Sequence, residues 1–426
     1  MSLKRYPTLL GLTLGLTLLA CDAARRSSDD TDQRRPRTAA LGTDASVRRV
    51  LPKPTIRDSA GVRLIEYSTL SPMPPTWAAV KNPLRGELAN LPPALQIDPR
   101  PFLSLGGLRT NPEEEFDASH PMLSATELTN GTIVVNDRAQ LKFFTRTGRF
   151  LRAVGRKGMG PGEFQQTRKV CRFHGDMLLV VDYVGDRLTL WDANGEHIRT
   201  YPRIGRVHAC HAGGALVVQD ATVEAVANSA GDLMGSYALR RPDGTLVREL
   251  GMLPASFSAG GMSRSPAILP IGNELYIGNA RVYEVQVQGF DGRIRRSTRI
   301  TGPLVPISDE QWQQHAEAMV PRDATTEQRA LLESFTRTKP FDYFPAFWGV
   351  RIDPVGRTWI QDFESAANWT VLDSSGVIMG RFEVPGAGLG SRSQLVGLGA
   401  DYVVLLQEGA DGSVHLKFHH FTIVAD

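Results

Sequence analysis

The sequence predicts an all-β fold built from repeated sheets, and two observations support this prediction. One pattern occurs five times: an apolar strand that ends in Asp or Asn, a short gap, a second alternating strand, and a turn that closes on glycine. The closing glycines lie 47, 49, 48 and 84 residues apart, at Gly148, Gly195, Gly244, Gly292 and Gly376. Three of them follow Asn or Asp, and such dipeptides favour hairpin turns because these turns need positive φ. A strand-rich period of this length is typical of a propeller blade, a four-stranded sheet that buries its faces against its neighbours.

The number of repeats predicts a six-bladed β-propeller, with seven blades as the alternative. Five blades fit between residues 122 and 385, and innermost strands are expected at 207–210, 267–269 and 347–352. The final stretch supplies only three strands, at 394–398, 402–407 and 414–424. The alternating run Val62-Arg63-Leu64-Ile65-Glu66 has no blade of its own. We expect it to be the missing outer strand of the last blade, because joining the two ends of the chain removes an exposed sheet edge.

The last glycine interval exceeds one period by about 36 residues, and this insertion has a helical pattern. Ser308 with Gln311, and Thr325 with Gln328, form sequence signatures of capping boxes at the start of two amphipathic runs. We therefore expect a helical hairpin within residues 303–345, inserted in a propeller domain that spans residues 55–426.

Aromatic side chains are concentrated in and just after this insertion. They could form one wall of a ligand site over the mouth of the central channel. The residues of this predicted ligand face are Trp312, Phe341, Tyr343, Phe344 and Trp348. The alternative is that the rings only pack the hairpin onto the disc.

The N-terminal residues have the features of an export signal. Lys4 and Arg5 precede an uncharged run at 9–20, which is shorter than the roughly 20 residues of a membrane-spanning helix. The segment that ends at Cys21 resembles the lipobox of bacterial lipoproteins, and this resemblance implies cleavage before Cys21 and lipid on its sulfur. We expect residues 1–20 to be a signal peptide and 21–54 a disordered tether that is rich in Arg, Asp, Ser, Thr and Pro. The protein would then be anchored to a membrane of the cell envelope and face the periplasm or the exterior.

Two cysteines remain after Cys21 is assigned to the lipid. Cys171 and Cys210 occupy nearly equivalent positions on the inner strands of adjacent predicted blades. An oxidising compartment permits a disulfide between them, if their Cα atoms lie within about 7 Å. The alternative is two buried free thiols.

Two segments carry a family resemblance. Residues 155–164, with the sequence GRKGMGPGEF, resemble the loop that links blades in NHL-type propellers. Residues 57–63, with the sequence RDSAGVR, are similar to the opening of the bacterial six-bladed β-propeller lipoproteins. The resemblance implies the fold and names no ligand. The glycine-rich loop lacks the GxGxxG spacing and does not end in Gly-Lys-Ser/Thr, so we do not expect it to bind a nucleotide.

Candidate chemistry is sparse. No Gly-x-Ser-x-Gly or His-Glu-x-x-His motif is present, and no catalytic residue is predicted. His208 and His211 flank Cys210 in the one local cluster of metal-ligand types. Acidic residues recur at the ends of the first strands, where they could either surround a cation or cap the turn that follows. These residues are Asp137, Asp182, Asp220 and Asp362.

The sequence favours a binding or scaffold module for a protein, peptide or small ligand at one face of the propeller, without a cofactor. The alternative is a lactonase-like or lyase-like enzyme with a divalent metal in the channel. The formal net charge of +3 is small for 426 residues, and no basic stripe with interleaved aromatics occurs, so nucleic acid is not an expected partner.

Overall fold

The computed structural model describes residues 51–68, 88, 91–109, 111–117, 123–228, 233–259, 262–301, 306–318, 320, 324–337, 339, 342–363, 367–387 and 393–424. The chain divides into two compact units. The larger comprises Val50–Phe257, Arg264–Val305 and Pro345–Asp426, and the smaller includes Pro306–Phe344. In the part of the chain that the structure describes, no helix is long and apolar enough to cross a membrane.

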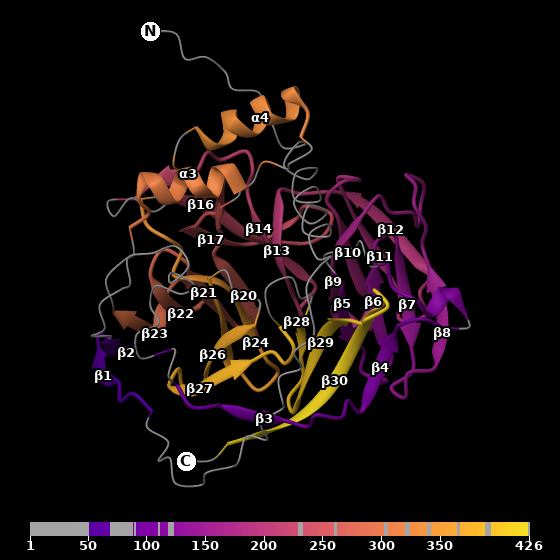
Figure 1. Cartoon of the computed structure of the whole chain (residues 1–426), viewed down its shortest axis with the longest axis horizontal. Helices are drawn as coiled ribbons and strands as arrows, with labels where there is room; N and C mark the ends of the chain where they lie inside the picture. Colours follow the sequence, from indigo (N-terminus) through magenta and orange to yellow (C-terminus); the bar gives the residue numbers. More distant parts are fainter. Residues whose placement is uncertain are drawn as a thin grey trace, which may run out of the picture. The chain divides into compact units, whose positions relative to one another are not determined.

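Six sheets form a ring in the larger unit (Figure 1), so the predicted six blades are confirmed. Blade 1 contains β5 (Ser124–Glu127), β6 (Ile133–Asp137), β7 (Gln140–Phe144) and β8 (Phe150–Val154), and blade 2 contains β9 (Thr167–Arg172), β10 (Leu178–Asp182), β11 (Arg187–Trp191) and β12 (His197–Pro202). Blade 3 contains β13 (Arg206–His211), β14 (Ala215–Gln219), β16 (Leu233–Arg240) and β17 (Leu246–Pro254), with the short β15 (Val226–Ala227) beside β16.

The second half of the ring repeats this arrangement. Blade 4 contains β20 (Ala267–Ile271), β21 (Glu274–Asn279), β22 (Tyr283–Gly289) and β23 (Ile294–Thr301), and blade 5 contains β24 (Phe347–Ile352), β25 (Thr358–Asp362), β26 (Asn368–Leu372) and β27 (Ile378–Glu383). Blade 6 contains β28 (Gln394–Leu398), β29 (Tyr402–Glu408) and β30 (Val414–Ile423), completed by β3 (Leu95–Ile97) and β4 (Leu103–Gly106). β18 (Phe257–Ala259) and β19 (Met262–Arg264) form a separate pair, and short 3₁₀ turns occur at η3 (Pro112–Glu114) and η4 (His174–Asp176).

The hairpin turns have the backbone geometry that the closing glycines predict. All five of these glycines have positive φ, for example 85° at Gly148 and 92° at Gly376. Glycine adopts this conformation without the steric cost that a Cβ would impose. The repeat spacing is therefore set by turns that need glycine.

The ring closes through N-terminal strands, although not the strand that the sequence predicted. β3 and β4 both pair antiparallel with β30, and Leu105 of β4 lies opposite Leu416. Innermost strands β28 and β5 lie against each other at the junction of blades 6 and 1. The two ends of the chain thus share one blade, which protects the edge of β30 from pairing with another molecule.

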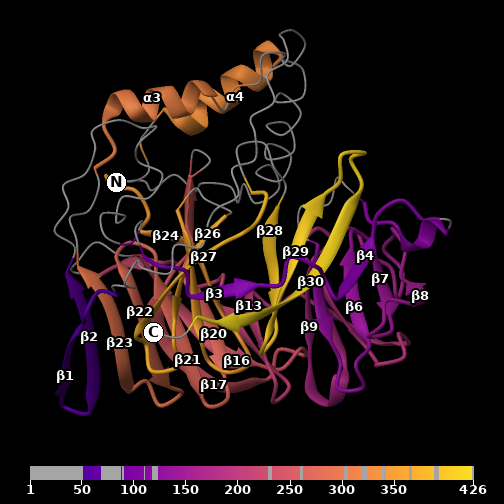
Figure 2. The ribbon, with the colours of Figure 1, turned by 60° about the horizontal axis from the view of Figure 1, so that its bottom comes forward.

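The expected closing strand at Val62–Glu66 was wrongly placed. It lies in β2 (Val62–Ser68), which pairs parallel with β23 and antiparallel with β1 (Thr55–Ser59) (Figure 2). These two strands extend blade 4 to six strands. An alternating pattern shows that a strand has one buried face, and Ile65 and Tyr67 are buried as this pattern predicts. The pattern does not identify the strand with which β2 pairs.

Apolar side chains fill the space between neighbouring blades. Phe143 of blade 1 packs with Leu178 and Trp191 of blade 2, and the ring centroid of Phe164 lies 5.5 Å from that of Trp191 in a tilted arrangement. Each of these side chains is buried, and burial of one large apolar side chain contributes about 1.5–3 kcal/mol. Because a blade buries both faces only when it has neighbours, the ring stabilises each of its sheets.

The smaller unit contains the predicted helices, α3 (Asp309–Ala318) and α4 (Thr326–Thr336). Both capping boxes form. The Gln311 backbone N–H donates to the Ser308 hydroxyl at 3.1 Å, and the Gln328 backbone N–H donates to the Thr325 hydroxyl at 3.2 Å. The two helices are joined by the Trp312 indole, which donates to the Thr336 carbonyl at 2.8 Å.

Candidate functional site

The inner strands of the six blades surround the axis of the ring (Figure 1). Each inner strand pairs with only one strand of its own sheet, and its two faces meet the neighbouring blades. An exposed side chain on such a strand must therefore open toward the axis or toward an end of the ring. Partly exposed side chains on these strands mark the candidate site.

Four inner strands carry a bulge that places one extra residue against the neighbouring strand. In β9, Thr167 lies opposite Asp182 and Lys169 opposite Val181, which leaves Arg168 as the extra residue. The corresponding residues in β13, β24 and β28 are His208, Trp348 and Val396. Bulges redirect a side chain and are frequent next to functional sites.

Arg168 and Trp348 occupy equivalent positions. Thr167 and Phe347, the residues before them, both lie opposite the aspartate that ends the next strand. Because the inner strands of all blades run in the same direction along the axis of the ring, Arg168 and Trp348 lie toward the same end of the ring. Trp348 is 48% exposed and Arg168 is half-buried.

The inner strands of blades 2, 3 and 5 also bring together positive charge. Arg168 and Lys169 lie on β9, Arg206 on β13 and Arg351 on β24. Among the residues that the structure describes, no carboxylate lies within ion-pair distance of any of these four. The Arg168 Nε is buried and, in the described chain, has no hydrogen-bond partner.

Lys169 and Arg351 come from opposite blades, because blades 2 and 5 are three positions apart in a ring of six. Burial, together with the positive charge of Arg351, lowers the pKa of the Lys169 ammonium to about 8. Burial also lowers the pKa of Arg351, although this side chain is exposed. Arg351 lies on the inner strand of blade 5, so its exposed side chain opens toward the axis or toward an end of the ring.

Polar groups of blades 2 and 3 surround this charge. The Tyr183 hydroxyl donates to the Val207 carbonyl at 2.7 Å, and the guanidinium carbon of Arg168 lies 6.0 Å from the centre of the Tyr183 ring. Burial raises the pKa of Tyr183, while Arg206 and its neighbours oppose this effect. The phenol therefore stays protonated and adds no negative charge to the site.

His208 is an uncharged member of the site at neutral pH. Its Nε2 lies 3.2 Å from the Gln219 Oε1 and 3.4 Å from the Tyr237 hydroxyl. The pKa of His208 is lowered to about 4, mainly by burial; the Gln219 hydrogen bond opposes this shift, and the nearby charges of Arg206 and Lys169 contribute to it. The Lys169 ammonium donates to the His208 carbonyl, which links β9 to β13.

A disulfide makes the same connection covalently. Cys171 of β9 and Cys210 of β13 are bonded, with their Cα atoms 6.1 Å apart. Each cysteine lies two residues after a residue of the site, Lys169 or His208. β9 and β13 belong to different sheets, so the disulfide fixes the spacing of two strands that share no ladder of hydrogen bonds.

The aromatic residues of the predicted ligand face have different environments. Trp312 and Phe344 are buried, whereas Tyr343 is 39% and Trp348 is 48% exposed. Phe341 and Cys21 lie outside the described residues. A ligand face therefore stays a prediction for Tyr343 and Trp348, of which Trp348 belongs to the inner strands.

The strand-end acids and the local His cluster bind protein groups. The Asp182 carboxylate accepts from the Gln165 N–H at 2.7 Å and the Gly185 N–H at 2.8 Å, and the Asp220 carboxylate accepts from the Thr222 N–H at 2.9 Å. The His211 Nε2 lies 2.8 Å from the Gly272 carbonyl oxygen. No group of three or more His, Cys, Asp or Glu side chains in the described ranges could hold a metal ion.

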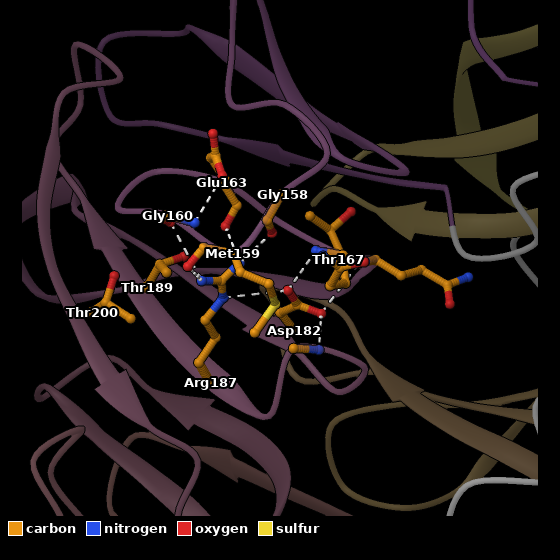
Figure 3. Close-up of polar contacts among 12 residues, drawn as sticks. Gly158, Met159, Gly160, Glu163, Thr167, Asp182, Arg187, Thr189 and Thr200 are labelled. Carbon is orange, nitrogen blue, oxygen red and sulfur yellow. Dashed lines mark hydrogen bonds and ion pairs between the residues drawn. The ribbon is translucent and has the colours of Figure 1, made fainter.

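The glycine-rich loop at residues 155–164 folds around an arginine (Figure 3). The Arg187 guanidinium donates to the carbonyls of Gly158, Met159 and Glu163 at 2.6–2.7 Å. The Glu163 carboxylate in turn accepts from the Gly160 N–H at 2.7 Å. These carbonyl groups point at a cation of the protein itself, so the loop is a connection between blades 1 and 2.

Comparison with known proteins agrees with this architecture. Residues 116–203 match the model of the DUF5128 family, which is described as a 6-bladed beta-propeller. The chain is a six-bladed β-propeller protein. A search of curated proteins gives no match.

Three solved structures are similar to this propeller at low sequence identity. A Bacteroides fragilis protein described as exported is 12% identical, with a TM-score of 0.47, over 85% of this chain and 100% of that one. A Bacteroides vulgatus member of the DUF4221 family is 9% identical, with a TM-score of 0.48, over 78% and 99% of the two chains. An inactive variant of virginiamycin B lyase from Staphylococcus aureus is 9% identical, with a TM-score of 0.38, over 73% and 84%. Identities this low concern the fold alone.

The positive charge at the axis of this propeller was not predicted from the sequence. A signal was present: the inner strands of blades 2, 3 and 5, with the sequences TRKVCR, RVHACH and FWGVRI, contain basic residues and no acidic ones. Only Arg172 among these basic residues has a carboxylate partner in the described chain, Asp176 at 3.0 Å. The pattern becomes visible once the inner strands are aligned by blade.

Proposed function

We propose that this protein is an exported, lipid-anchored binding module that holds a small ligand at the axis of its propeller. The bulges in the inner strands carry this proposal, because they bring Arg168, His208 and Trp348 to the part of the ring where inner strands converge. These side chains offer hydrogen-bond donors and an aromatic surface. Ligand sites commonly combine such groups in a small concave region.

Export and anchoring are supported by two independent features. The segment that ends at Cys21 resembles a lipobox, and the Cys171–Cys210 disulfide is of the kind that persists in oxidising compartments. Replacement of Cys21 with Ser should move the protein from the membrane fraction to the soluble fraction after cell lysis. Retention in the membrane fraction would refute the lipid anchor.

The electrostatics of the axis do not favour a divalent metal there. Lys169 and Arg351 are both cations, and each would repel a third positive charge in a setting where solvent screens poorly. We therefore propose a binding role at this site in preference to metal-dependent hydrolysis.

The position of the site can be tested by screening small ligands against matched variants. Full-length protein in detergent is screened by thermal shift with a panel of sugars, nucleotides, carboxylic acids and short peptides. A ligand at 100 times its Kd stabilises by about 2.7 kcal/mol, a shift of about 3 °C for a domain of this size. Trp348→Ala should abolish the shift and Tyr343→Ala, which alters an exposed aromatic of the insertion, should preserve it. The reverse result would place the site on the insertion and refute the proposal.

A further inference from the structure

We infer that the ligand at the propeller axis is a small oxyanion with at least two negative charges, held between Lys169 and Arg351 and bounded by Arg168 and Arg206. This inference rests on the proposed function and names the chemistry of its ligand. It follows from the charge balance of the site, from the hydrogen-bonding capacity of its side chains and from its position in the ring.

The axis carries four cations on the inner strands of three blades. Two buried cations elsewhere have a buried aspartate beside them: the Lys142 Nζ lies 2.8 Å from the Asp137 Oδ2, and the Arg357 Nε lies 2.5 Å from the Asp353 Oδ2. The four cations of the axis have no such partner among the described residues. Uncompensated like charges repel in a poorly solvated site, and a bound anion removes this repulsion.

The side chains of the site can donate hydrogen bonds but offer few acceptors. Guanidinium and ammonium groups only donate, and the buried Nε of Arg168 is an unused donor in the described chain. His208 already interacts with Gln219 through its Nε2. A ligand that satisfies these donors must present acceptors, and ionised oxygens are the acceptors that guanidinium groups bind most strongly.

The opposed positions of Lys169 and Arg351 set the number of charges. A monoanion between them would neutralise one cation and leave the other repelled by Arg168 and Arg206. Phosphate monoesters and polycarboxylates both carry two or more charges with several oxygens. They share the chemistry that the site requires, and separate probes distinguish between them.

The experiment is a calorimetric titration of the full-length protein in detergent at pH 7 and low salt. Inorganic phosphate and citrate are the two probes, and chloride at the same ionic strength is the reference. We expect at least one probe to bind the wild-type protein, with an affinity that weakens as salt is added. Each charged hydrogen bond accounts for about a tenfold to hundredfold change in affinity, so Lys169→Met and Arg351→Met should each weaken binding by that factor.

A matched control removes a positive charge elsewhere. Arg248 is exposed on β17, the outer strand of blade 3, and Arg248→Met should leave the affinity within about twofold. Loss of the repelled cations should also raise the melting temperature of the ligand-free Lys169→Met and Arg351→Met variants. A folded variant with increased stability and reduced affinity cannot be explained by misfolding.

The outcomes separate this inference from the proposed function. Binding of phosphate or citrate that depends on Lys169 and Arg351 supports the inference, and the probe that binds identifies the class of oxyanion. Binding of neither probe, or binding that survives both substitutions, overturns it. If a neutral ligand from the thermal-shift screen still depends on Trp348, the binding module stands and only the anionic chemistry fails.

Discussion

Removal of the Cys171–Cys210 disulfide should destabilise the propeller by about 4 kcal/mol. The bond closes a loop with a sequence separation of 39 residues. In the chain-entropy model, such a closure lowers the entropy of the unfolded chain by about 2.1 + 1.5R ln 39, or about 13 cal/mol/K, which is about 4 kcal/mol at 25 °C. Residues 55–426 have an unfolding entropy of roughly 0.8 kcal/mol/K at about 2.1 cal/mol/K per residue, so the melting temperature should fall by about 5 °C.

The assay compares the double variant Cys171→Ala, Cys210→Ala with the wild-type protein by thermal melting, with and without dithiothreitol. Reductant should lower the melting temperature of the wild-type protein to that of the variant and leave the variant unchanged. A variant that melts within about 1 °C of the oxidised wild-type protein would refute the reasoning. It would mean that the packing of blades 2 and 3 already restrains these strands, or that the unfolded chain retains structure.

Three further predictions concern the closing strand, the insertion and a buried histidine. In chemical denaturation, Leu105→Ala should lower the free energy of unfolding by about 2–5 kcal/mol, because this side chain is buried. The control Leu108→Ala, at an exposed position, should lower it by less than about 0.5 kcal/mol. Equal effects of the two substitutions would argue against closure of the ring through β4. Trp312→Ala should remove about 3–5 kcal/mol from the helices and accelerate amide exchange in α3 and α4, while Trp348→Ala should leave that exchange unchanged. The pKa of His208 is lowered from 6.5 to about 4 in the folded protein. Its contribution to the free energy of unfolding is therefore fully present above pH 6.5 and is lost as the pH falls toward 4, because the unfolded chain then binds a proton that the folded chain does not. His208→Gln should remove this pH dependence of the free energy of unfolding, which is at most about 1.4 kcal/mol per pH unit between pH 6.5 and 4. An identical pH profile of stability for both proteins would contradict the prediction.

Local features of the fold were predictable from the sequence. Turns such as those at Gly148 and Gly376 require positive φ, and one glycine in the sequence is enough to indicate such a turn. The capping boxes at Ser308 and Thr325 depend on residues three positions apart, so their hydrogen bonds follow from local spacing. The blade count follows from the regular period that these turns define.

The partner of an unassigned strand was not predictable in the same way. Ile65 in β2 and Leu105 in β4 are both buried, and both strands precede the first complete blade. β4 spans only Leu103–Gly106, too short for a distinctive alternation, while the longer β2 has the clearer pattern. Strand pairing across more than 200 residues depends on which surfaces remain unpaired after the other blades have formed. That information is distributed over the whole chain.

The candidate site depends on the blade count more directly than on any motif. Lys169 and Arg351 are 182 residues apart, and no local pattern connects them. In a ring of six they lie on opposite blades and face each other across the ring, whereas a ring of seven has no directly opposite pair. The bulges at Arg168 and Trp348 then bring two further side chains toward one end of the same opening. The chemistry at the axis therefore follows from the number and register of the blades, and a sequence that kept every basic residue but changed the repeat number would lose it.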